Sequence, residues 1–539
     1  MKKKNSFKSL FLVLALVLSL LVGSGNAFAK VTGPGNAKAN GGNAWAIGQL
    51  GNTETINLVA INDFHGSVSE DIKSRNPGIA KIAGVINEMK KLNQTFFLSA
   101  GDNFQGTAIS NLTHGEVVNE AFKLMDLKAS AIGNHEYDWG TDWIEKWSTQ
   151  GGYPFLASNI VYKATGEPVD YADPYMIQEV TLKSGKVVKI GYVGLATPET
   201  AYKTAAANVI DIDFTDPVKA ATRWAKYLRE VKKVDAVVAL THLGGSQNRD
   251  TGVITGEVYD LAMGAKGIDL ILSGHSHQTI DGVVNGVQIL QAYYVGRSLQ
   301  VGQLTFNNRN RKLVKVEGYV YDIRSVMSTL PIDPKVDALV KEYETRLAPI
   351  FGVKIGENKQ ALAHAASTGL TPLGQWTAKS LATIGGTQIG LINGGGIREP
   401  LPAGDITMGT MYTLFPFDNT LVTLKITGAK LKEQIDNLLT ADGAGAGQYY
   451  GVKVTFDGGK AKGSRITSFT PEDGTPVDPA AIYTLSILDF MYTGGDKYNF
   501  TGTTEVVDTF VPVRDALVNY IKMTGIIDYT FDPTAYVKQ

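Results

Sequence analysis

The chain contains no cysteine among its 539 residues. Disulfide bonds are therefore excluded, and any metal ion must be held by nitrogen and oxygen ligands, because no thiolate is available. A chain of this length can bury a sufficient core without covalent cross-links, and it is long enough for two or three domains. Its net charge is only −1 at pH 7, so composition gives no indication of binding to nucleic acids or to a membrane surface.

Long apolar runs are also scarce, and the one that is present lies within residues 1–29. It follows the basic stretch MKKKNSFK and ends at the small residues Ala27–Ala29. This pattern is typical of a cleaved secretory signal peptide, and the apolar core is short for a transmembrane span of about 20 residues. We therefore expect residues 1–29 to be removed and the protein to be secreted, with no membrane span in its mature form and with association to the cell wall left open.

The rest of the sequence divides into regions of different pattern. Residues 30–53 are rich in Gly, Asn and Ala without apolar periodicity, which favours a flexible lead-in. Over 54–328, short apolar or β-branched runs alternate with amphipathic stretches such as Ile79–Leu92 and Pro217–Lys232. Strands alternating with helices predict an α/β domain with the sheet inside and helices outside. A linker helix is expected over 329–351, and a second α/β domain over 352–539.

Polar side chains follow five of the apolar runs in the first region, always at the same end of the run. Ligands of open α/β sheets bind at the carboxyl ends of the strands, so these side chains converge if the strands are parallel. Five of the seven histidines of the chain lie in these positions, which a polar rim without function explains poorly. The residues are Asp63, His65, Asp102, Asn134, His135, Asp138, His242, His275 and His277.

The composition of this set indicates its chemistry. Aspartate, histidine and asparagine fit zinc, manganese, cobalt or iron, and the set is too large for one ion. Two divalent ions about 3.5–4 Å apart, sharing a carboxylate, would use all the ligands and would clamp both oxygens of a displacement at phosphorus. His135, oriented by Asp138, would donate to the negative charge that develops in the transition state.

The series DFHG, GDN, GNHEYD, THLG and GHSH resembles the calcineurin-like metallophosphoesterases, and residues 56–528 are similar to the secreted bacterial 5′-nucleotidases. The resemblance implies a four-layer α/β/β/α metallophosphoesterase domain, followed by an α/β 5′-nucleotidase substrate-binding domain. It implies removal of the 5′-phosphate from nucleotides by attack of a metal-bound hydroxide, with His135 and Asp138 as the catalytic pair. One ion would be held by Asp63, His65, Asp102 and His277, and the other by Asp102, Asn134, His242 and His275.

The second region carries shorter matches to the same family. INGGGIR resembles its nucleotide-contacting turn, LFPFDNT supplies a phenylalanine, and LDFMYTGGD supplies a second phenylalanine and an aspartate. In the family, the two rings enclose the base and the aspartate holds the ribose hydroxyls. Without these motifs, the phenylalanines would be interpreted as core residues. The implied substrate contacts are Asn393, Arg398, Phe417, Phe490 and Asp496.

One departure from the family concerns the substrate. Family members usually carry an arginine before a helix start where this chain reads AASTGLTPLGQW, residues 365–376. The arginine is absent, so part of the usual anion contact is missing and the preferred phosphoester stays open. The alternatives are hydrolysis of UDP-sugars or of 2′,3′-cyclic nucleotides, and a non-catalytic extracellular binding protein on the same scaffold. The sequence leaves the oligomeric state open. We also expect the domains to rotate against each other, because neither contains both sets of residues.

Overall fold

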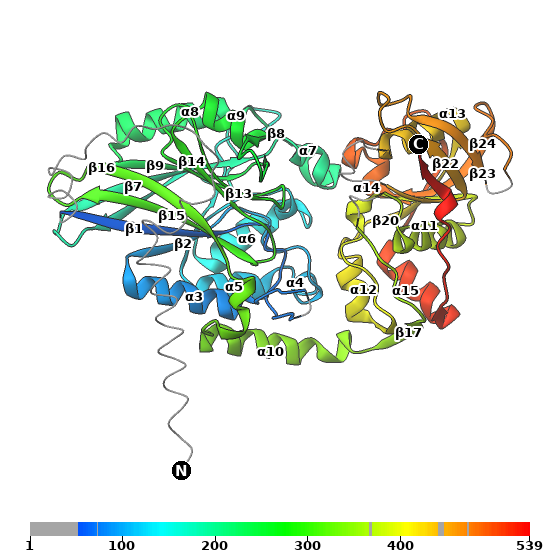
Figure 1. Cartoon of the computed structure of the whole chain (residues 1–539), viewed down its shortest axis with the longest axis horizontal. Coiled ribbons are helices and arrows are strands. Elements are labelled where there is room, and N and C mark those ends of the chain that lie inside the picture. The colour runs from blue at the N-terminus through cyan, green and yellow to red at the C-terminus, as the bar shows by residue number, and fades with distance from the viewer. Residues whose placement is uncertain (1–51, 73, 366–368, 440–446, 472–473) are drawn as a thin grey trace, which may run out of the picture.

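The computed structural model describes residues 52–539 except for residues 73, 366–368, 440–446 and 472–473. Over these residues the chain forms two α/β domains, coloured blue to green and yellow to red in Figure 1, which are joined through helix α10 (Pro334–Phe351). The signal peptide expected at 1–29 and nearly all of the lead-in expected at 30–53 lie outside the described residues. The expected domain bounds stay predictions.

The first domain contains two six-stranded sheets. In spatial order, the first sheet consists of β16 (Leu313–Asp322), β15 (Ser298–Asn307), β1 (Thr53–Ile61), β2 (Thr95–Ser99), β3 (Leu127–Ala131) and β4 (Phe155–Leu156). The strands β1 to β4 are parallel, and β15 and β16 extend the sheet antiparallel on the far side of β1.

The second sheet is built in a similar way. Its strands are, in spatial order, β13 (Thr279–Val284), β14 (Val287–Ala292), β12 (Leu270–Ser273), β9 (Ala236–His242), β7 (Val187–Ala196) and β6 (Tyr175–Thr181). The four inner strands are parallel, and the edge strands β13 and β6 are antiparallel to their neighbours. Two short antiparallel pairs complete the domain, β5 (Ile160–Tyr162) with β8 (Ile212–Phe214) and β10 (Ser246–Gln247) with β11 (Ile254–Thr255).

Strand β1 shows why the sheets stack. Its side chains alternate between the two faces, and both faces are apolar. Ile56 and Leu58 pack into a buried cluster with Leu272 of the second sheet, whereas Val59 and Ile61 pack on the opposite side among residues of the helices. A strand that is apolar on both faces is covered on both faces, so the sequence of β1 places the first sheet between the second sheet and a helical layer.

Helices cover the two outer faces. The first sheet is covered by α3 (Ile79–Leu92), α5 (Glu116–Leu124) and α6 (Asp142–Gly151), and the second by α8 (Pro217–Tyr227) and α9 (Glu257–Gly264). Helix α8 starts where the sequence predicted, because Asp216 accepts hydrogen bonds from the backbone of Val218 and Lys219 and proline occupies the first turn. The four-layer α/β/β/α arrangement is confirmed.

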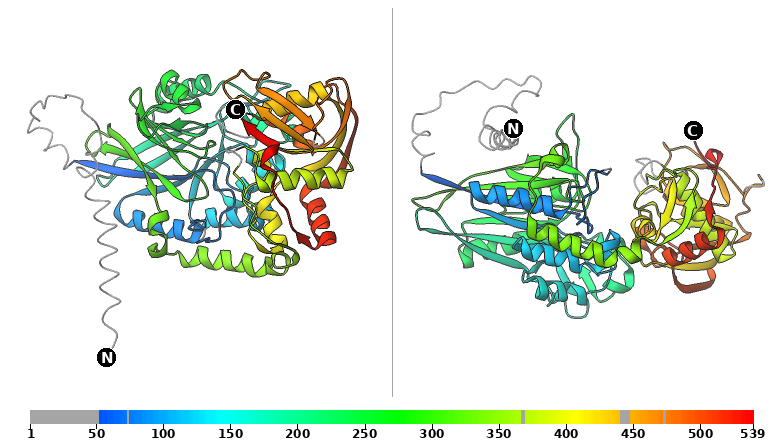
Figure 2. Two further views of the ribbon diagram at one scale, coloured as in Figure 1. Left: turned by 45° about the vertical axis from the view of Figure 1, so that its right-hand side comes forward. Right: turned by 90° about the horizontal axis from the view of Figure 1, so that it is seen from below.

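Helix α10 packs against the first domain and leads to the second (Figure 2). Asp333 caps its start by accepting from the backbone of Lys335 and Val336. Its buried residues recur every three or four positions, and they join the cluster that contains α3 and α5: Val336, Val340, Tyr343 and Leu347. The amphipathic pattern of this stretch thus packs the connecting helix against the first domain.

The second domain is built around one cluster of buried apolar residues. Its central sheet has the order β21 (Gln448–Tyr450), β18 (Ile389–Ile392), β24 (Ile482–Leu488), β20 (Thr420–Thr427) and β25 (Thr504–Pro512). The domain also contains two three-stranded sheets. The first has the order β19 (Gly404–Thr407), β17 (Lys354–Asn358) and β26 (Ile526–Ile527). The second has the order β23 (Ile466–Pro471), β22 (Val452–Phe456) and β27 (Tyr536–Lys538). The helices are α11 (Pro372–Gly385), α12 (Met408–Leu414), α13 (Gly428–Leu438) and α15 (Val513–Thr524).

The turns that carry the motifs DFHG, GDN and GNHEYD come at the ends of β1, β2 and β3 of the first sheet. The turns with THLG and GHSH come at the ends of β9 and β12 of the second sheet. The alternation of strands and helices indicated a sheet covered by helices without fixing the number of sheets, and the turns come from two sheets. Because the strands are parallel within each sheet, their carboxyl ends share an edge, and the two edges meet where the backbone N–H of His275 lies 3.1 Å from each carboxylate oxygen of Asp63. Among the described residues, no helix has the length and apolar content to cross a bilayer.

Candidate metal centre and substrate cleft

The turns that carry the expected metal ligands have an unusual backbone. Five of these residues adopt positive φ angles between 49° and 79°, a region that residues other than glycine rarely occupy. Such conformations cost about 1–3 kcal/mol each and persist where the surrounding structure enforces them, typically at functional sites. The five residues are Asp63, His65, Asp102, His275 and His277.

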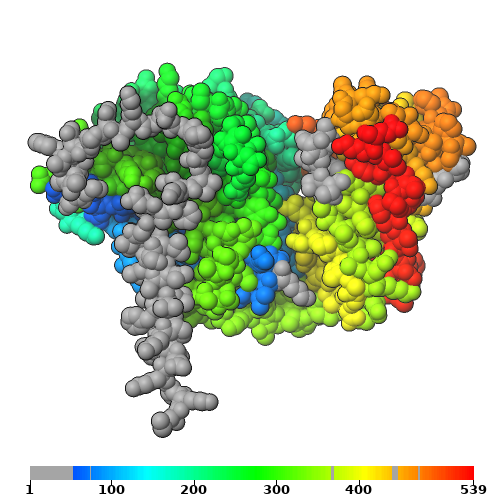
Figure 3. Space-filling model, viewed as in Figure 1, coloured from blue at the N-terminus to red at the C-terminus, as the bar shows by residue number. Residues whose placement is uncertain are grey.

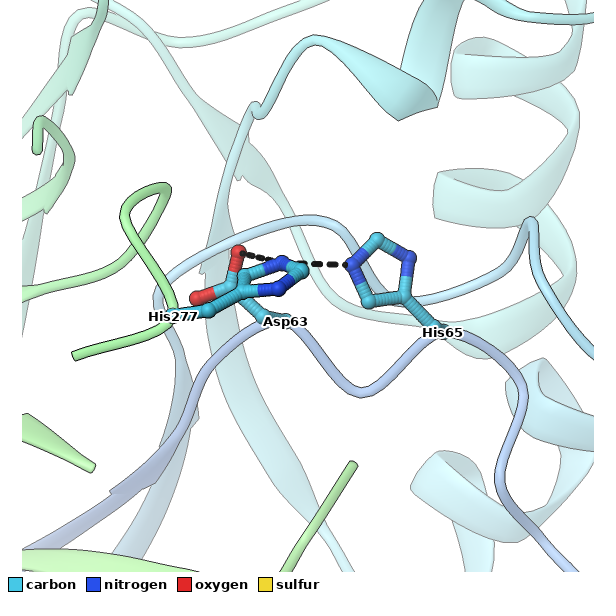
Figure 4. Close-up of side chains that lie close together, drawn as sticks. All are labelled: Asp63, His65 and His277. Atoms are coloured by element: carbon cyan, nitrogen blue, oxygen red, sulfur yellow. Dashed lines mark hydrogen bonds and ion pairs between the residues drawn. The ribbon is translucent and has the colours of Figure 1, made fainter. Parts of the chain in front are cut away.

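The first group of potential ligands consists of Asp63, His65 and His277, whose donor atoms lie within 4.8 Å of one another. Figure 4 shows Asp63 and His65 projecting from the turn after β1 toward His277, which comes from the turn after β12. Nε2 of His277 lies 3.4 Å from Oδ1 of Asp63 and 3.1 Å from Nε2 of His65. Three donors from two sheets thus face one point.

The second group consists of Asp102, His242 and His275. Oδ2 of Asp102 lies 3.0 Å from Nε2 of His242, and Oδ1 of Asn134 lies 3.0 Å from Nδ1 of His275. The two groups are adjacent, because Nε2 of His242 is also 3.9 Å from Oδ1 of Asp63. The structure therefore brings all seven expected ligands together, while the sharing of Asp102 between two ions stays a prediction.

Two of the histidines have the hydrogen positions that metal ligands need. Nδ1 of His65 lies 2.9 Å from the carbonyl oxygen of Gln105, and Nδ1 of His242 lies 2.7 Å from that of Ala100. A carbonyl oxygen only accepts, so each Nδ1 carries a hydrogen and Nε2 is the nitrogen of each ring that can bind a metal ion. Nε2 of His242 faces a carboxylate oxygen of Asp102, which stabilises a positive charge at this nitrogen, whether a proton or a metal ion in its place. The donor set fits divalent metal ions.

The electrostatics of the two groups also favour cations. Burial would lower the pKa of His242, but Asp102 and Asp63 raise it to about 10. Burial would raise the pKa of Asp63, but His277 and His242 hold it at about 2. The two carboxylates therefore stay ionised in the interior and attract positive charge to this edge of the sheets.

His135 lies beside the two groups as the sequence predicted. Its Nδ1 is 2.7 Å from Oδ2 of Asp138, and its backbone N–H donates to Oδ1 of Asp102 over 2.9 Å. Burial would lower the pKa of the His135 imidazole, but Asp138 and Asp102 raise it above its ordinary value. The hydroxyl of Thr204 donates to the other oxygen of Asp138 over 3.0 Å and fixes the orientation of the pair. The arrangement suits a cationic hydrogen-bond donor.

Glu136, which follows His135, has a role that the sequence did not show. Its buried carboxylate accepts from the backbone N–H groups of Asp102 at 2.8 Å, Asn103 at 2.8 Å and Gly133 at 2.6 Å. Burial and the charge of Asp102 raise the pKa of Glu136 to about 7, although these hydrogen bonds lower it. The carboxylate ties two of the motif turns together. Its place within GNHEYD gave a local signal, but the pattern did not reveal which groups it binds.

The five expected nucleotide contacts of the second domain lie on the same cleft as four of the seven expected metal ligands. The cleft has a volume of about 790 Å³, which is in the usual range for small-molecule sites. In Figure 3 the surfaces of the two domains meet, green against yellow. The lining includes Asn134, His135 and His275 from the first domain, and Asn393, Arg398, Phe417, Phe490 and Asp496 from the second.

Several contacts define the second-domain side of this cleft. The ring of Phe417 is 5.6 Å from that of His135 and inclined by 30°, and the guanidinium carbon of Arg398 is 5.7 Å from the Phe417 ring. Asn393 donates to Oδ2 of Asp496 over 2.8 Å. Both phenylalanine side chains are half-buried at the cleft and not enclosed in the core. That the two rings enclose a base stays a prediction.

The segment that usually carries the family's arginine starts a helix here. Thr371 caps α11 by accepting from the backbone of Gly374, and His364 bridges Thr371 to the carbonyl oxygen of Gly394 in the INGGG turn. Residues 366–368 of this segment are not among the residues that the structure describes. His364 and His114 were not expected in the metal site, and neither is among the potential metal ligands of the described residues.

Three further residues of the site carry no sequence pattern. Glu199 lies 3.1 Å from Nε2 of His275, which holds the pKa of Glu199 at about 2, and Lys203 lies 2.7 Å from Asp496 across the domains. The side-chain amide of Gln105 lines the cleft, is 1% exposed and has no hydrogen-bond partner among the described residues. Gln105 is close to the GDN motif and could have been suspected from that, whereas Glu199 and Lys203 act over long sequence separations.

Comparison with known proteins agrees with this geometry. Residues 56–279 match the family model "Calcineurin-like phosphoesterase", and residues 354–503 match "5′-nucleotidase, C-terminal domain". The chain is 30% identical over 513 residues to "Endonuclease YhcR" of Bacillus subtilis, an alignment covering 90% of this chain but 40% of the relative. It is 26% identical over 539 residues to "Cell wall protein Lmo0130" of Listeria monocytogenes, covering 87% of this chain and 67% of the relative.

A solved structure extends the likeness over both domains. The crystal structure of a 5′-nucleotidase precursor from Thermus thermophilus superposes with a TM-score of 0.77 at 25% identity. The match covers 90% of this chain and 99% of that chain, so the folds and the order of the two domains are shared. The chain therefore combines a calcineurin-like phosphoesterase domain with a 5′-nucleotidase C-terminal domain, which indicates a metal-dependent phosphoester hydrolase.

Proposed function

We propose that the protein is a secreted phosphohydrolase that removes the 5′-phosphate from nucleotides with the help of two divalent metal ions. One observation carries this proposal. Members of both groups of potential metal ligands, His277 of the first and Asp102 and His275 of the second, line the same cleft as all five nucleotide-contacting candidates, although they come from two domains. A metal site that served only stability would not need an aromatic and cationic surface facing it.

The metal ions would be held by the seven expected ligands. Zinc, manganese, cobalt and iron all suit this nitrogen and oxygen donor set. Bound divalent ions polarise phosphoryl oxygens and supply a nucleophile at neutral pH. Glu199 and the backbone carbonyl groups of Ala100 and Gln105 support the ligands by fixing ring nitrogens of His275, His242 and His65.

His135 would act on the phosphoryl group. Its Nδ1 is engaged by Asp138, so a protonated ring keeps an N–H at Nε2 for a phosphoryl oxygen. The raised pKa of His135 favours that protonated ring at neutral pH. A fixed cationic donor is most effective where negative charge grows during the reaction. The unpartnered amide of Gln105 is a second donor that would reach the phosphoryl oxygens.

The second domain would hold the nucleoside. A base between Phe417 and Phe490 gains roughly 1–3 kcal/mol from stacking, by analogy with single-stranded nucleic acids, and stacking tolerates different bases. Asp496 and Asn393 would contact the ribose, and Arg398 would face the phosphate. These contacts give a nucleotide preference without strict base selection.

We also propose that the protein acts outside the cell. The support is the signal-peptide pattern of residues 1–29 and the printed name of the Listeria relative, a cell wall protein. An acid- and histidine-based centre without cysteine is compatible with an oxidising environment.

Phosphate release from a panel of substrates tests the proposal. Purified protein is treated with a chelator and assayed with AMP, ATP, UDP-glucose and cyclic AMP, with and without added Mn²⁺ or Zn²⁺. We expect release from AMP that requires added metal and is abolished by the chelator. Nucleotide binding without any hydrolysis in metal-replete buffer would contradict the enzyme proposal and favour a binding protein on this scaffold.

Phosphodiester cleavage is the second candidate. It is favoured by the relationship to the Bacillus endonuclease, which at 30% identity covers most of this chain, and by the missing anion-binding arginine. The same panel, extended with 2′,3′-cyclic AMP, separates the candidates. Faster turnover of a diester or of UDP-glucose than of AMP would make the second candidate the main activity.

A further inference from the structure

The predicted ribose-binding carboxylate, Asp496, is held from both domains at once. Asn393 donates to its Oδ2 over 2.8 Å within the second domain, and Nζ of Lys203 lies 2.7 Å from its Oδ1 across the cleft. Asp496 has a positive φ of 52° and follows Gly494 and Gly495 in a tight turn. A strained aspartate held on both oxygens is presented to the cleft in one orientation.

Lys203 is tied in turn to the catalytic side. It ends the short helix α7 (Thr200–Lys203), and its carbonyl oxygen accepts from Nδ2 of Asn134 over 3.3 Å. The next residue, Thr204, donates its hydroxyl to Asp138. The backbone of Lys203 is therefore positioned by a predicted metal ligand and by the catalytic pair, and its side chain extends from there to the second domain.

The pair of Lys203 and Asp496 matches a vicinal diol. A carboxylate only accepts hydrogen bonds and an ammonium group only donates them, with three N–H groups of which Asp496 uses one. Each hydroxyl of a ribose can both donate and accept. The Lys203 side chain is 37% exposed and the Asp496 side chain 24% exposed, and both line the cleft. Neighbouring hydroxyls placed there would satisfy the donor and the acceptor together.

We propose that Lys203 is a specificity-determining residue that, with Asp496, recognises the 2′,3′-diol of ribose, so that ribonucleotides are preferred over 2′-deoxyribonucleotides. This inference rests on the proposed nucleotide hydrolysis. Loss of one hydroxyl leaves one N–H of Lys203 or one acceptor position of Asp496 without its partner, and sites built to bind a hydroxyl discriminate strongly against analogues that lack it.

The test compares kcat/KM for AMP and for 2′-deoxy-AMP in the wild type and in Lys203→Met. The ratio of the two values is the readout, and bis(p-nitrophenyl) phosphate, which has no ribose, serves as a reference for the state of the metal centre. Lys497→Met is the matched control, because Lys497 is adjacent to Asp496 at the same interface but lies 4.4 Å over the Tyr202 ring and is not part of the cleft lining.

We expect a wild-type preference for AMP of at least about tenfold, the scale of one hydrogen bond to a charged group. The ratio should fall by roughly tenfold in Lys203→Met and stay unchanged in Lys497→Met. Calorimetric binding of adenosine and 2′-deoxyadenosine gives the same ratio if Lys203→Met hydrolyses nothing, and Lys203→Arg should keep most of it. An equal ratio in wild type and Lys203→Met would overturn the inference. A wild type that cleaves the reference ester but neither nucleotide would instead contradict the proposed function, and the inference with it.

Discussion

The two walls of the cleft are built differently. On the first domain, each predicted metal ligand lies at the end of a strand or in the turn that follows it, and Asp63, Asp102, Asn134 and His242 are at most 3% exposed. On the second domain, the nucleotide contacts come from loops and short helices, and Phe417, Phe490 and Asp496 are only half-buried. The first wall is fixed within its own domain, whereas the second depends on the other domain, as the pair of Lys203 and Asp496 shows. Under the proposed function, the metal centre is thus preorganised within one domain, whereas the substrate site needs residues of both domains.

The largest effect is expected from the preorganised wall. Replacing Asp102 by alanine removes a ligand from the second group and the acceptor for the His135 backbone. We expect loss of bound metal and a fall in AMP hydrolysis of more than about a thousandfold, since metal assistance supplies several kcal/mol. Elemental analysis and phosphate release are the measurements, with Asp250→Ala, an exposed aspartate, as control. An Asp102→Ala protein with full metal content would show that this wall does not hold the ions.

The catalytic pair should behave differently from the ligands. His135→Ala is expected to lower kcat for AMP by roughly 10²–10⁴, the range for general acid–base groups, with metal content nearly unchanged. Single-turnover phosphate release measures the chemical step, and His114→Ala, an exposed histidine outside the ligand groups, is the control. If His135→Ala kept wild-type kcat, the role of His135 in the reaction would be refuted.

A cross-link between the two domains tests whether turnover needs the domains to rotate against each other. Burial lowers the pKa of His114 in the first domain, and the charge of Asp418 in the second domain partly opposes this shift. The two residues therefore lie near each other across the interface. Because the chain has no cysteine, His114→Cys with Asp418→Cys introduces the only thiols. A bis-maleimide cross-link should reduce AMP turnover to the uncross-linked fraction. Each single variant treated with the reagent is the control, and full turnover by cross-linked protein would rule out a required domain rotation.

The smallest effect is expected from one stacking contact. Phe417→Ala should raise KM for AMP by roughly 5- to 150-fold, the equivalent of about 1–3 kcal/mol of stacking. Hydrolysis of bis(p-nitrophenyl) phosphate, which has no base, should change much less. Phe510→Ala is the control, because Phe510 is 82% exposed and not part of the cleft lining. Equal KM values for AMP in Phe417→Ala and wild type would remove Phe417 from the nucleotide site.

Most of the candidate site residues on the first domain could be predicted, because each is marked by the residues next to it in the sequence. Each ligand lies at or just after the end of an apolar run, as His242 is the last residue of β9, and parallel strands carry such residues to one edge. The helices α3 and α8 begin at the predicted residues for similarly local reasons. The split of these strands between two sheets was not contained in the alternation of strands and helices, because periodicity shows which faces are apolar and not which sheet a strand joins.

Contacts between distant segments were beyond the sequence pattern. Lys203 and Asp496 are 293 positions apart, and Glu199 and His275 are 76 positions apart. Nothing in the residues around Lys203 or Glu199 distinguishes them from surface charges. The second-domain contacts were identified by family resemblance, since a phenylalanine such as Phe490 gives no local signal that separates a cleft from a core.

The most direct test of the account is a metal titration of chelator-treated protein. Mn²⁺ or Zn²⁺ is added in known amounts, and phosphate release from AMP is followed at each ratio of metal to protein. The account predicts no activity without metal and a rise that levels off at two ions per chain. Activity that survives removal of all metal, or that is complete with a single bound ion, would contradict it.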